Sequence, residues 1–180
     1  LYNIIEELAS KADMPMPRVY VIPDRTPNAF ATGRNPSHAA VAATEGILQL
    51  LNDEELSGVM AHELTHVKNR DTLTSTVVAS IVGAITMVGQ MGRYNVSSRN
   101  RNPLMLIVLL LAPLAAMLIR MAISRVREYT ADEGGAKISG KPLGLANALS
   151  KISQGATSDP IRMGNPADSH LFIVNPFLGG

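Results

Sequence analysis

The segment from His62 to His66 carries two imidazoles and a carboxylate in the pattern H-E-x-x-H. Residues four apart on an α-helix share one face, so both histidines can bind the same metal ion. Glu63, beside the first histidine, can then reach a water molecule on that ion and take its proton. The pattern predicts a zinc site that hydrolyses peptide bonds, with His62 and His66 as ligands and Glu63 as catalytic base. The alternative is an ordinary helix surface carrying two histidines and a glutamate.

A third ligand must come from elsewhere, because a catalytic zinc ion usually has three protein ligands and one open position. The chain has no cysteine, so that ligand is a histidine or a carboxylate. We predict Glu128, which lies in a segment with helical signals, with Asp132 one turn further along the same side. From there Asp132 can accept a hydrogen bond from a ligand imidazole and fix its tautomer. The alternative is a solvated charged face.

Composition limits the remaining possibilities. The chain has 180 residues and a net charge of +1, which suits one domain with a core and gives no basic surplus for binding nucleic acid. The absence of cysteine excludes disulfides and thiolate zinc sites. Because the chain opens on Leu1, we expect it to be part of a longer protein with a further N-terminal segment.

A small antiparallel sheet is predicted in the first quarter of the chain, after an amphipathic helix at residues 1–12. The strands are predicted at 18–22, 28–32 and 38–44. Together with the helices below, they make the expected fold α+β and mainly helical, a single metallopeptidase domain over residues 1–180.

The helix that carries the motif should begin near Asp53. Asn52 is a good N-cap, and Glu55 stands three residues later, as in a capping box. The acidic first turn suits the positive end of the helix dipole. We expect this helix to run to about Asp71.

Two apolar blocks follow, at residues 73–92 and 104–123. Each has about the 20 residues that a bilayer-spanning helix needs, and membrane helices tolerate a proline such as Pro113. The blocks predict a transmembrane hairpin inserted between the H-E-x-x-H helix and the third-ligand helix. The alternative is a buried helical pair in a soluble protein, because the first block is rich in serine, threonine and glycine.

Basic residues favour a cytoplasmic position for the catalytic side of this hairpin. The linker between the two blocks holds only Arg93, Arg99 and Arg101. Seven basic residues flank the hairpin on the other side: Lys68, Arg70, Arg120, Arg125, Arg127, Lys137 and Lys141.

Beyond the hairpin, the second apolar helix should continue through Glu128 and be capped by Gly134 and Gly135. A further helix is predicted at residues 142–152. From Ser153 onward the composition predicts a loop.

Two segments carry a resemblance to a known family. Residues 62–71 (HELTHVKNRD) and 124–132 (SRVREYTAD) are similar to the HtpX membrane metalloproteases, relatives of the CAAX prenyl proteases with a gluzincin-type zinc site. The likeness covers nearly the whole chain. Residues 28–33 (NAFATG) resemble the segment just before the substrate-binding strand of that family, and residues 169–176 (SHLFIVNP) resemble its C-terminal motif.

The resemblance implies a zincin-like catalytic domain with one zinc ion per chain, in a multi-pass protein of the bacterial or archaeal plasma membrane. Its expected function is endopeptidase activity on the cytoplasmic side, degrading misfolded membrane proteins as part of protein quality control and the stress response. Its partners would be polypeptide substrates and the lipid bilayer, and not nucleic acid. Members of the family usually carry two more spans before the region seen here.

Further roles complete the predicted site. The resemblance implies that His170 stabilises the oxyanion and that the stretch Asn28, Ala29, Phe30 and Ala31 binds substrate. An edge strand, either 39–44 or 28–32, could pair with an extended peptide. Asn69 and Asp71 are predicted either to support the metal ligands or to cap the helix.

Two other functions stay open at this point. One is a membrane scaffold whose protease site is inactive, which replacement of Glu63 would distinguish. The other is a protease of prenylated peptides with a narrow substrate range, which a lipidated peptide would distinguish.

Overall fold

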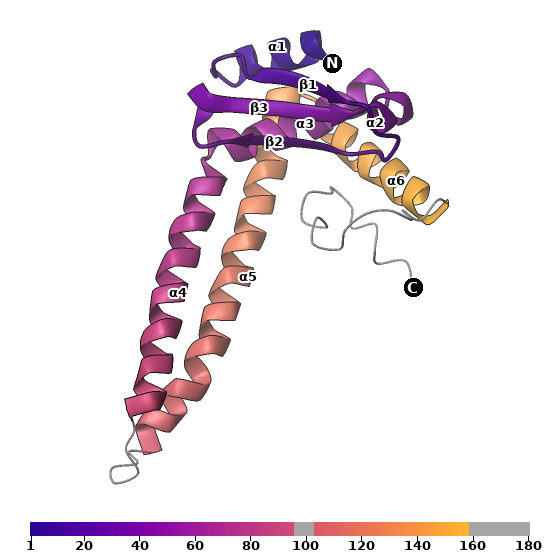
Figure 1. Cartoon of the computed structure of the whole chain (residues 1–180). Helices are drawn as coiled ribbons and strands as arrows, with labels where there is room; N and C mark the ends of the chain where they lie inside the picture. Colours follow the sequence, from indigo (N-terminus) through magenta and orange to yellow (C-terminus); the bar gives the residue numbers. More distant parts are fainter. Residues whose placement is uncertain (96–102, 159–180) are drawn as a thin grey trace. The chain divides into compact units, whose positions relative to one another are not determined.

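A computed structural model describes residues 1–95 and 103–158 (Figure 1). These residues form two compact units. The first comprises residues 1–72 together with the chain from Thr130 onward, and the second comprises residues 73–129. Each unit is described by itself below.

The first unit contains a three-stranded sheet, as predicted, but the sheet is mixed. Its strands are β1 (Arg18–Ile22), β2 (Ala29–Gly33) and β3 (Ala39–Thr44). Their order is β1-β3-β2, with β3 parallel to β1 and antiparallel to β2 (Figure 1). The prediction of an antiparallel sheet was wrong because the chain reverses twice, at each end of β2, and then enters the middle of the sheet. The central position of β3 also excludes residues 39–44 as an edge strand.

One face of this sheet packs on helices. The buried cluster joins odd-numbered strand residues such as Val41 and Ala43 to Ile5 and Leu8 of α1 (Tyr2–Lys11) and to Leu64. A short helix, α2 (Glu45–Leu50), follows β3 and adds Ile47. The even-numbered residues point to the opposite face, because side chains alternate along a strand. The core therefore lies between one face of the sheet and the helices.

The helix of the H-E-x-x-H motif is α3 (Asp53–Lys68), and its start is as predicted. Asn52 Oδ1 accepts from the Glu55 N–H at 2.9 Å, and a Glu55 carboxylate oxygen accepts from the Asn52 N–H at 3.0 Å. The predicted end at Asp71 was three residues late. Arg70 has φ 55, and this left-handed conformation breaks the helix before α4 begins.

Gly134 and Gly135 do not end the next long helix, which corrects the predicted cap. α5 (Pro103–Ser139) runs through both residues and ends just before Gly140, whose φ is 69. A glycine adopts that conformation without strain. The last helix, α6 (Pro142–Ser158), also runs beyond the predicted residue 152. It packs on α3, with Ala148 and Ile152 buried.

The second unit consists of most of α4 (Asp71–Asn95) and the first part of α5. Both apolar blocks are helical, as predicted, and Arg127 donates a hydrogen bond to Ser75 within this unit. Among the residues with described positions, no helix is long and apolar enough to cross a membrane. The predicted spans at 73–92 and 104–123 are therefore not supported by these helices. Hydroxyl residues such as Thr76 and Ser80 lower the mean hydropathy of the first block.

Candidate metal centre and active site

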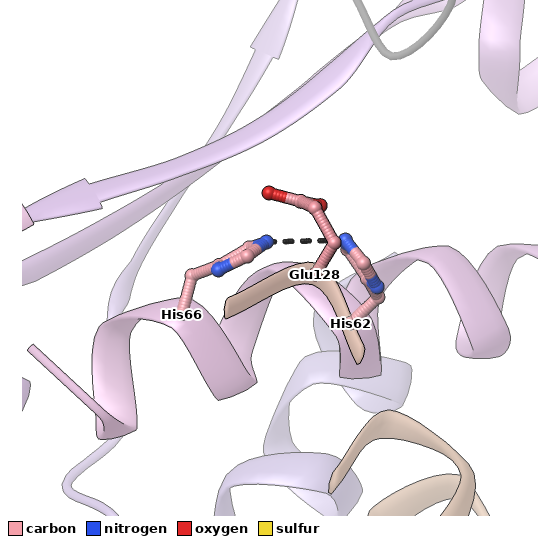
Figure 2. A group of neighbouring side chains, drawn as sticks. All are labelled: His62, His66 and Glu128. Carbon is pink, nitrogen blue, oxygen red and sulfur yellow. Dashed lines mark hydrogen bonds between the residues drawn. The ribbon is translucent and has the colours of Figure 1, made fainter. Parts of the chain in front are cut away.

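His62 and His66 lie one turn apart on α3 and turn their imidazoles toward each other. The two Nε2 atoms are 3.1 Å apart, and the rings meet edge to face at 85°. Glu128 on α5 completes a group of three residues whose ligand atoms all lie within 4.8 Å of one another. Figure 2 shows the Glu128 carboxylate beside the two facing nitrogens.

The other nitrogen of each imidazole lies against a carboxylate. Asp71 Oδ2 is 2.7 Å from His66 Nδ1, and Asp132 Oδ1 is 2.9 Å from His62 Nδ1. Asp71 is 13% exposed and Asp132 is 55% exposed. A carboxylate at Nδ1 favours the tautomer whose lone pair is on Nε2, the form that binds a metal ion. Asp71 can thus orient His66 through a hydrogen bond, and Asp132 lies within ion-pair distance of His62.

These donors fit a zinc ion. Two Nε2 lone pairs that face each other at 3.1 Å repel unless a proton or a cation lies between them, and a nearby carboxylate makes a cation more favourable. Two imidazoles and one carboxylate are a common ligand set of catalytic zinc. Because the chain has no cysteine, only nitrogen and oxygen atoms of side chains are available as metal ligands.

Glu63 faces the outer edge of β2. Its Oε2 accepts a hydrogen bond from the Ala31 N–H at 3.2 Å. Thr44 N–H donates to the Asn28 carbonyl at 2.9 Å, so the even-numbered backbone groups of β2 point into the sheet and the odd-numbered ones point outward. Of the four predicted substrate-binding residues, only Ala29 and Ala31 therefore present their backbone groups at the outer edge. Asn28 and Phe30 direct theirs to β3.

Gly135 has a role that sequence reasoning missed. A Cβ at this position would lie 2.9 Å from the backbone N and 3.0 Å from the Cα of His62. Only a glycine lets α5 approach the backbone of His62, a candidate metal ligand, this closely. The glycine pair is visible in the sequence, but it was interpreted as a helix cap.

The remaining predicted site residues lie elsewhere or outside the described residues. Asn69 ends α3, with its backbone N–H donating to the Thr65 carbonyl at 2.9 Å. His170 lies outside the described residues.

Comparison with known proteins agrees with this geometry. Residues 1–176 match Peptidase family M48. The chain belongs to this family. It is similar to two proteins named Protease HtpX homolog, from Thermococcus kodakarensis (54% identical) and from Pseudarthrobacter chlorophenolicus (57% identical). These alignments cover 99% and 100% of this chain but only 65% and 64% of the two relatives. The chain thus spans just under two thirds of their length.

A third Protease HtpX homolog, from Syntrophotalea carbinolica, is 51% identical over the whole chain, which covers 68% of that relative. Identities at this level over nearly all of the chain place it in the HtpX branch of family M48. The resemblance inferred from residues 62–71 and 124–132 is thereby confirmed.

Proposed function

We propose that this M48 member is a membrane-associated zinc endopeptidase that cleaves unfolded proteins, including misfolded membrane proteins. The observation that carries the proposal is the facing pair of Nε2 atoms, with the Glu128 carboxylate in the same group and Glu63 at the edge of β2. This combination joins a metal site, a general base and a place for an extended peptide within one small region.

Each residue has a role in this proposal. His62, His66 and Glu128 would hold the zinc ion. When bound, zinc supplies Lewis-acid polarisation of the scissile carbonyl and lowers the pKa of a coordinated water. Glu63 takes the proton of the attacking water and later delivers it to the leaving amine. The Ala31 N–H donates to the Glu63 carboxylate at this edge; a substrate strand would take over this donor and leave the carboxylate free to act as base.

The outer edge of β2 is the proposed place for the substrate backbone. An extended peptide that adds to a sheet edge is held by main-chain hydrogen bonds, which do not depend on its side chains. Such binding requires a chain segment free of its own secondary structure, and this requirement suits unfolded substrates. His170 remains the proposed stabiliser of the oxyanion.

Membrane association is supported by the apolar side chains of the second unit. The helices α4 and α5 carry large apolar side chains that are between 43% and 63% exposed, namely Leu73, Val77, Ile81, Ile85, Met87, Leu111, Leu114, Met117, Leu118, Ile119 and Met121. Soluble proteins rarely leave so many large apolar side chains in water. We propose that these residues contact lipid, with the catalytic side toward the cytoplasm as the distribution of basic residues favours.

The deciding experiment measures casein cleavage in detergent by the zinc-loaded protein and by Glu63→Gln, with the metal content of both determined. We expect the variant to keep its zinc and to lose at least about a hundredfold of the activity, because general base catalysis contributes that much. Equal cleavage by the two proteins would trace the activity to a contaminant. Absence of cleavage by the zinc-loaded wild type would overturn the proposal.

A further inference from the structure

The face of the sheet away from the helices carries an apolar hollow. Its volume is about 380 Å³, and all three strands contribute to it. The even-numbered side chains Tyr20, Phe30, Thr32 and Ala42 are among its lining residues. Tyr20 is 50% exposed and Phe30 is half-buried, so an aromatic surface is open at each side of this hollow.

The hollow continues to the edge at which Glu63 lies. Phe30 and Thr32 line it and also belong to β2, whose outward backbone groups face Glu63. Phe30 pairs with Ala42, and Thr32 pairs with Ala40. A fourth strand added beside β2 would extend this register, and its residues opposite Phe30 and Thr32 would point to the same face.

Side chains that oppose each other in adjacent strands have Cβ atoms about 5 Å apart. Two alternate side chains of an added strand would therefore contact Phe30 and Thr32 and enter the hollow from its β2 side. The residue between them would point to the other face of the sheet, toward α3 and the catalytic glutamate. The side chains of the added strand would therefore point alternately into the hollow and toward the candidate active site.

We propose that this hollow is a substrate subsite that takes alternate apolar side chains of an extended peptide bound at the edge of β2. This inference rests on the proposed function and adds a substrate class to it. The preferred segments alternate apolar and polar residues, as half-buried β-strands do. Folded proteins hide such segments, so the subsite selects strands exposed by unfolding.

Two peptides of identical composition test the subsite by binding rather than by turnover. One alternates apolar and polar residues, and the other groups the same residues into blocks. Each carries a fluorescent label, and its affinity for zinc-loaded Glu63→Gln is measured by anisotropy. We expect the alternating peptide to bind about threefold to tenfold more tightly, the range that two cross-strand contacts can supply.

Substitutions on β2 test whether the preference for the alternating peptide comes from the hollow. Phe30→Ser should reduce it to about twofold or less, because the largest cross-strand contact is lost. Thr32→Glu, at an exposed position, should reduce it as well by placing a charge at the hollow, and it serves as the second test if the Phe30 variant unfolds. Tyr2→Ser on α1 removes an aromatic side chain that is 57% exposed elsewhere, and it should leave the preference unchanged.

The outcomes separate the subsite from the protease activity. Equal binding of the two peptides, or a preference that survives in both β2 variants, would overturn the subsite even if the wild type cleaves casein. A preference that the β2 variants abolish would support the subsite even if the zinc-loaded wild type cleaves nothing. In that second case the protease proposal fails alone.

Discussion

At the scale of single residues, each histidine of the candidate site lies between a carboxylate and the other histidine. A carboxylate lies at Nδ1, and Nε2 faces the centre of the group. The carboxylates differ in their surroundings, because Asp71 is 13% exposed and Asp132 is 55% exposed. A charge interaction weakens in water, so Asp71 should orient its histidine more strongly than Asp132 does.

Replacing these carboxylates by amides should lower the affinity for zinc. We expect a loss of about tenfold to a hundredfold for Asp71→Asn and a smaller loss for Asp132→Asn, because outer carboxylates fix the ligand tautomer. Competition with a chromogenic chelator measures both. Glu133→Gln is the matched control, since Glu133 is next to Asp132 but pairs with Lys137. Unchanged affinity in both aspartate variants would exclude the orienting role.

At the scale of elements, α3 is the centre of the first unit. It contacts β2 through Glu63, α5 through the close approach at Gly135, and α6 through an ion pair between Glu55 and Lys151 at 2.8 Å. The position of α3 is therefore held by contacts with β2 and with two neighbouring helices. Disturbing either helix contact should change stability, but only the α5 contact lies directly behind His62, a candidate metal ligand.

Gly135→Ala tests the close approach of α5 to α3. The new Cβ would lie 2.9 Å from a backbone atom of His62, so the helices must separate, and we expect a loss of about 1–3 kcal/mol of stability together with weaker zinc binding. Gly83→Ala on α4 is the control, because its Cβ would meet nothing within 4 Å. The control should stabilise the protein by roughly 0.5–1 kcal/mol. Urea unfolding and zinc titration measure both variants, and a Gly135→Ala protein as stable as wild type would contradict the packing argument.

Glu55 links α3 to α6 in a manner that depends on pH. A hydrogen bond from Lys151 and another from the Asn52 backbone N–H hold the pKa of Glu55 below its usual value. The folded state therefore keeps this carboxylate ionised more readily than the unfolded state does. The stabilisation is fully present above the unfolded pKa near 4.5 and is lost as the pH falls through the lower, folded value.

Glu55→Gln should therefore flatten the acid side of the stability curve. We expect the difference in urea midpoint between wild type and variant to shrink as the pH falls from about 6 to about 3. The effect should be modest, because Lys151 is 45% exposed and water screens the pair. Glu54→Gln, at an exposed neighbouring position, is the control. Parallel curves for Glu55→Gln and wild type would show that this carboxylate does not titrate differently on folding.

At the scale of the whole molecule, the chain combines a packed unit that carries His62 and His66 with a second unit whose apolar side chains are exposed. In the first unit the large apolar residues Ile5, Leu64 and Met60 are fully buried. In the second unit Ile81 and Met117 are 56% and 59% exposed. This contrast in exposure is the observation on which the proposed lipid contact of the second unit rests.

Flotation with phosphatidylcholine vesicles tests the proposed membrane contact. Ile81→Lys and Met117→Lys should each lower the bound fraction by about tenfold, because each removes the transfer energy of a large apolar side chain. Tyr2→Lys, which replaces an exposed aromatic residue of the first unit, should have no effect. Equal flotation of the wild type and all three variants would show that the apolar side chains of the second unit do not contribute to lipid binding.

Much of the local structure could be predicted from the sequence. The capping box of Asn52 and Glu55 forms as predicted, because it needs only residues three apart. The three ligands chosen from the sequence are the three that the structure groups together. Helical periodicity also found α1 and α6, although α6 runs further than predicted. The direction of the strands and the role of Gly134 and Gly135 were predicted wrongly, because both depend on which distant segments pack together.

The sequence by itself determined which side chains are available for the candidate site: the H-E-x-x-H spacing brings two imidazoles to one helix face, and there are no thiolates. These properties follow from residue types and from the geometry of a single helix. Only the tertiary structure decided that β2 rather than β3 offers the edge beside Glu63, and that Gly135 lets α5 pack behind His62. The physical reason is that strand order and the distance between helices are set by the packing of the whole core. That packing involves residues far apart in the sequence, so no short stretch predicts it.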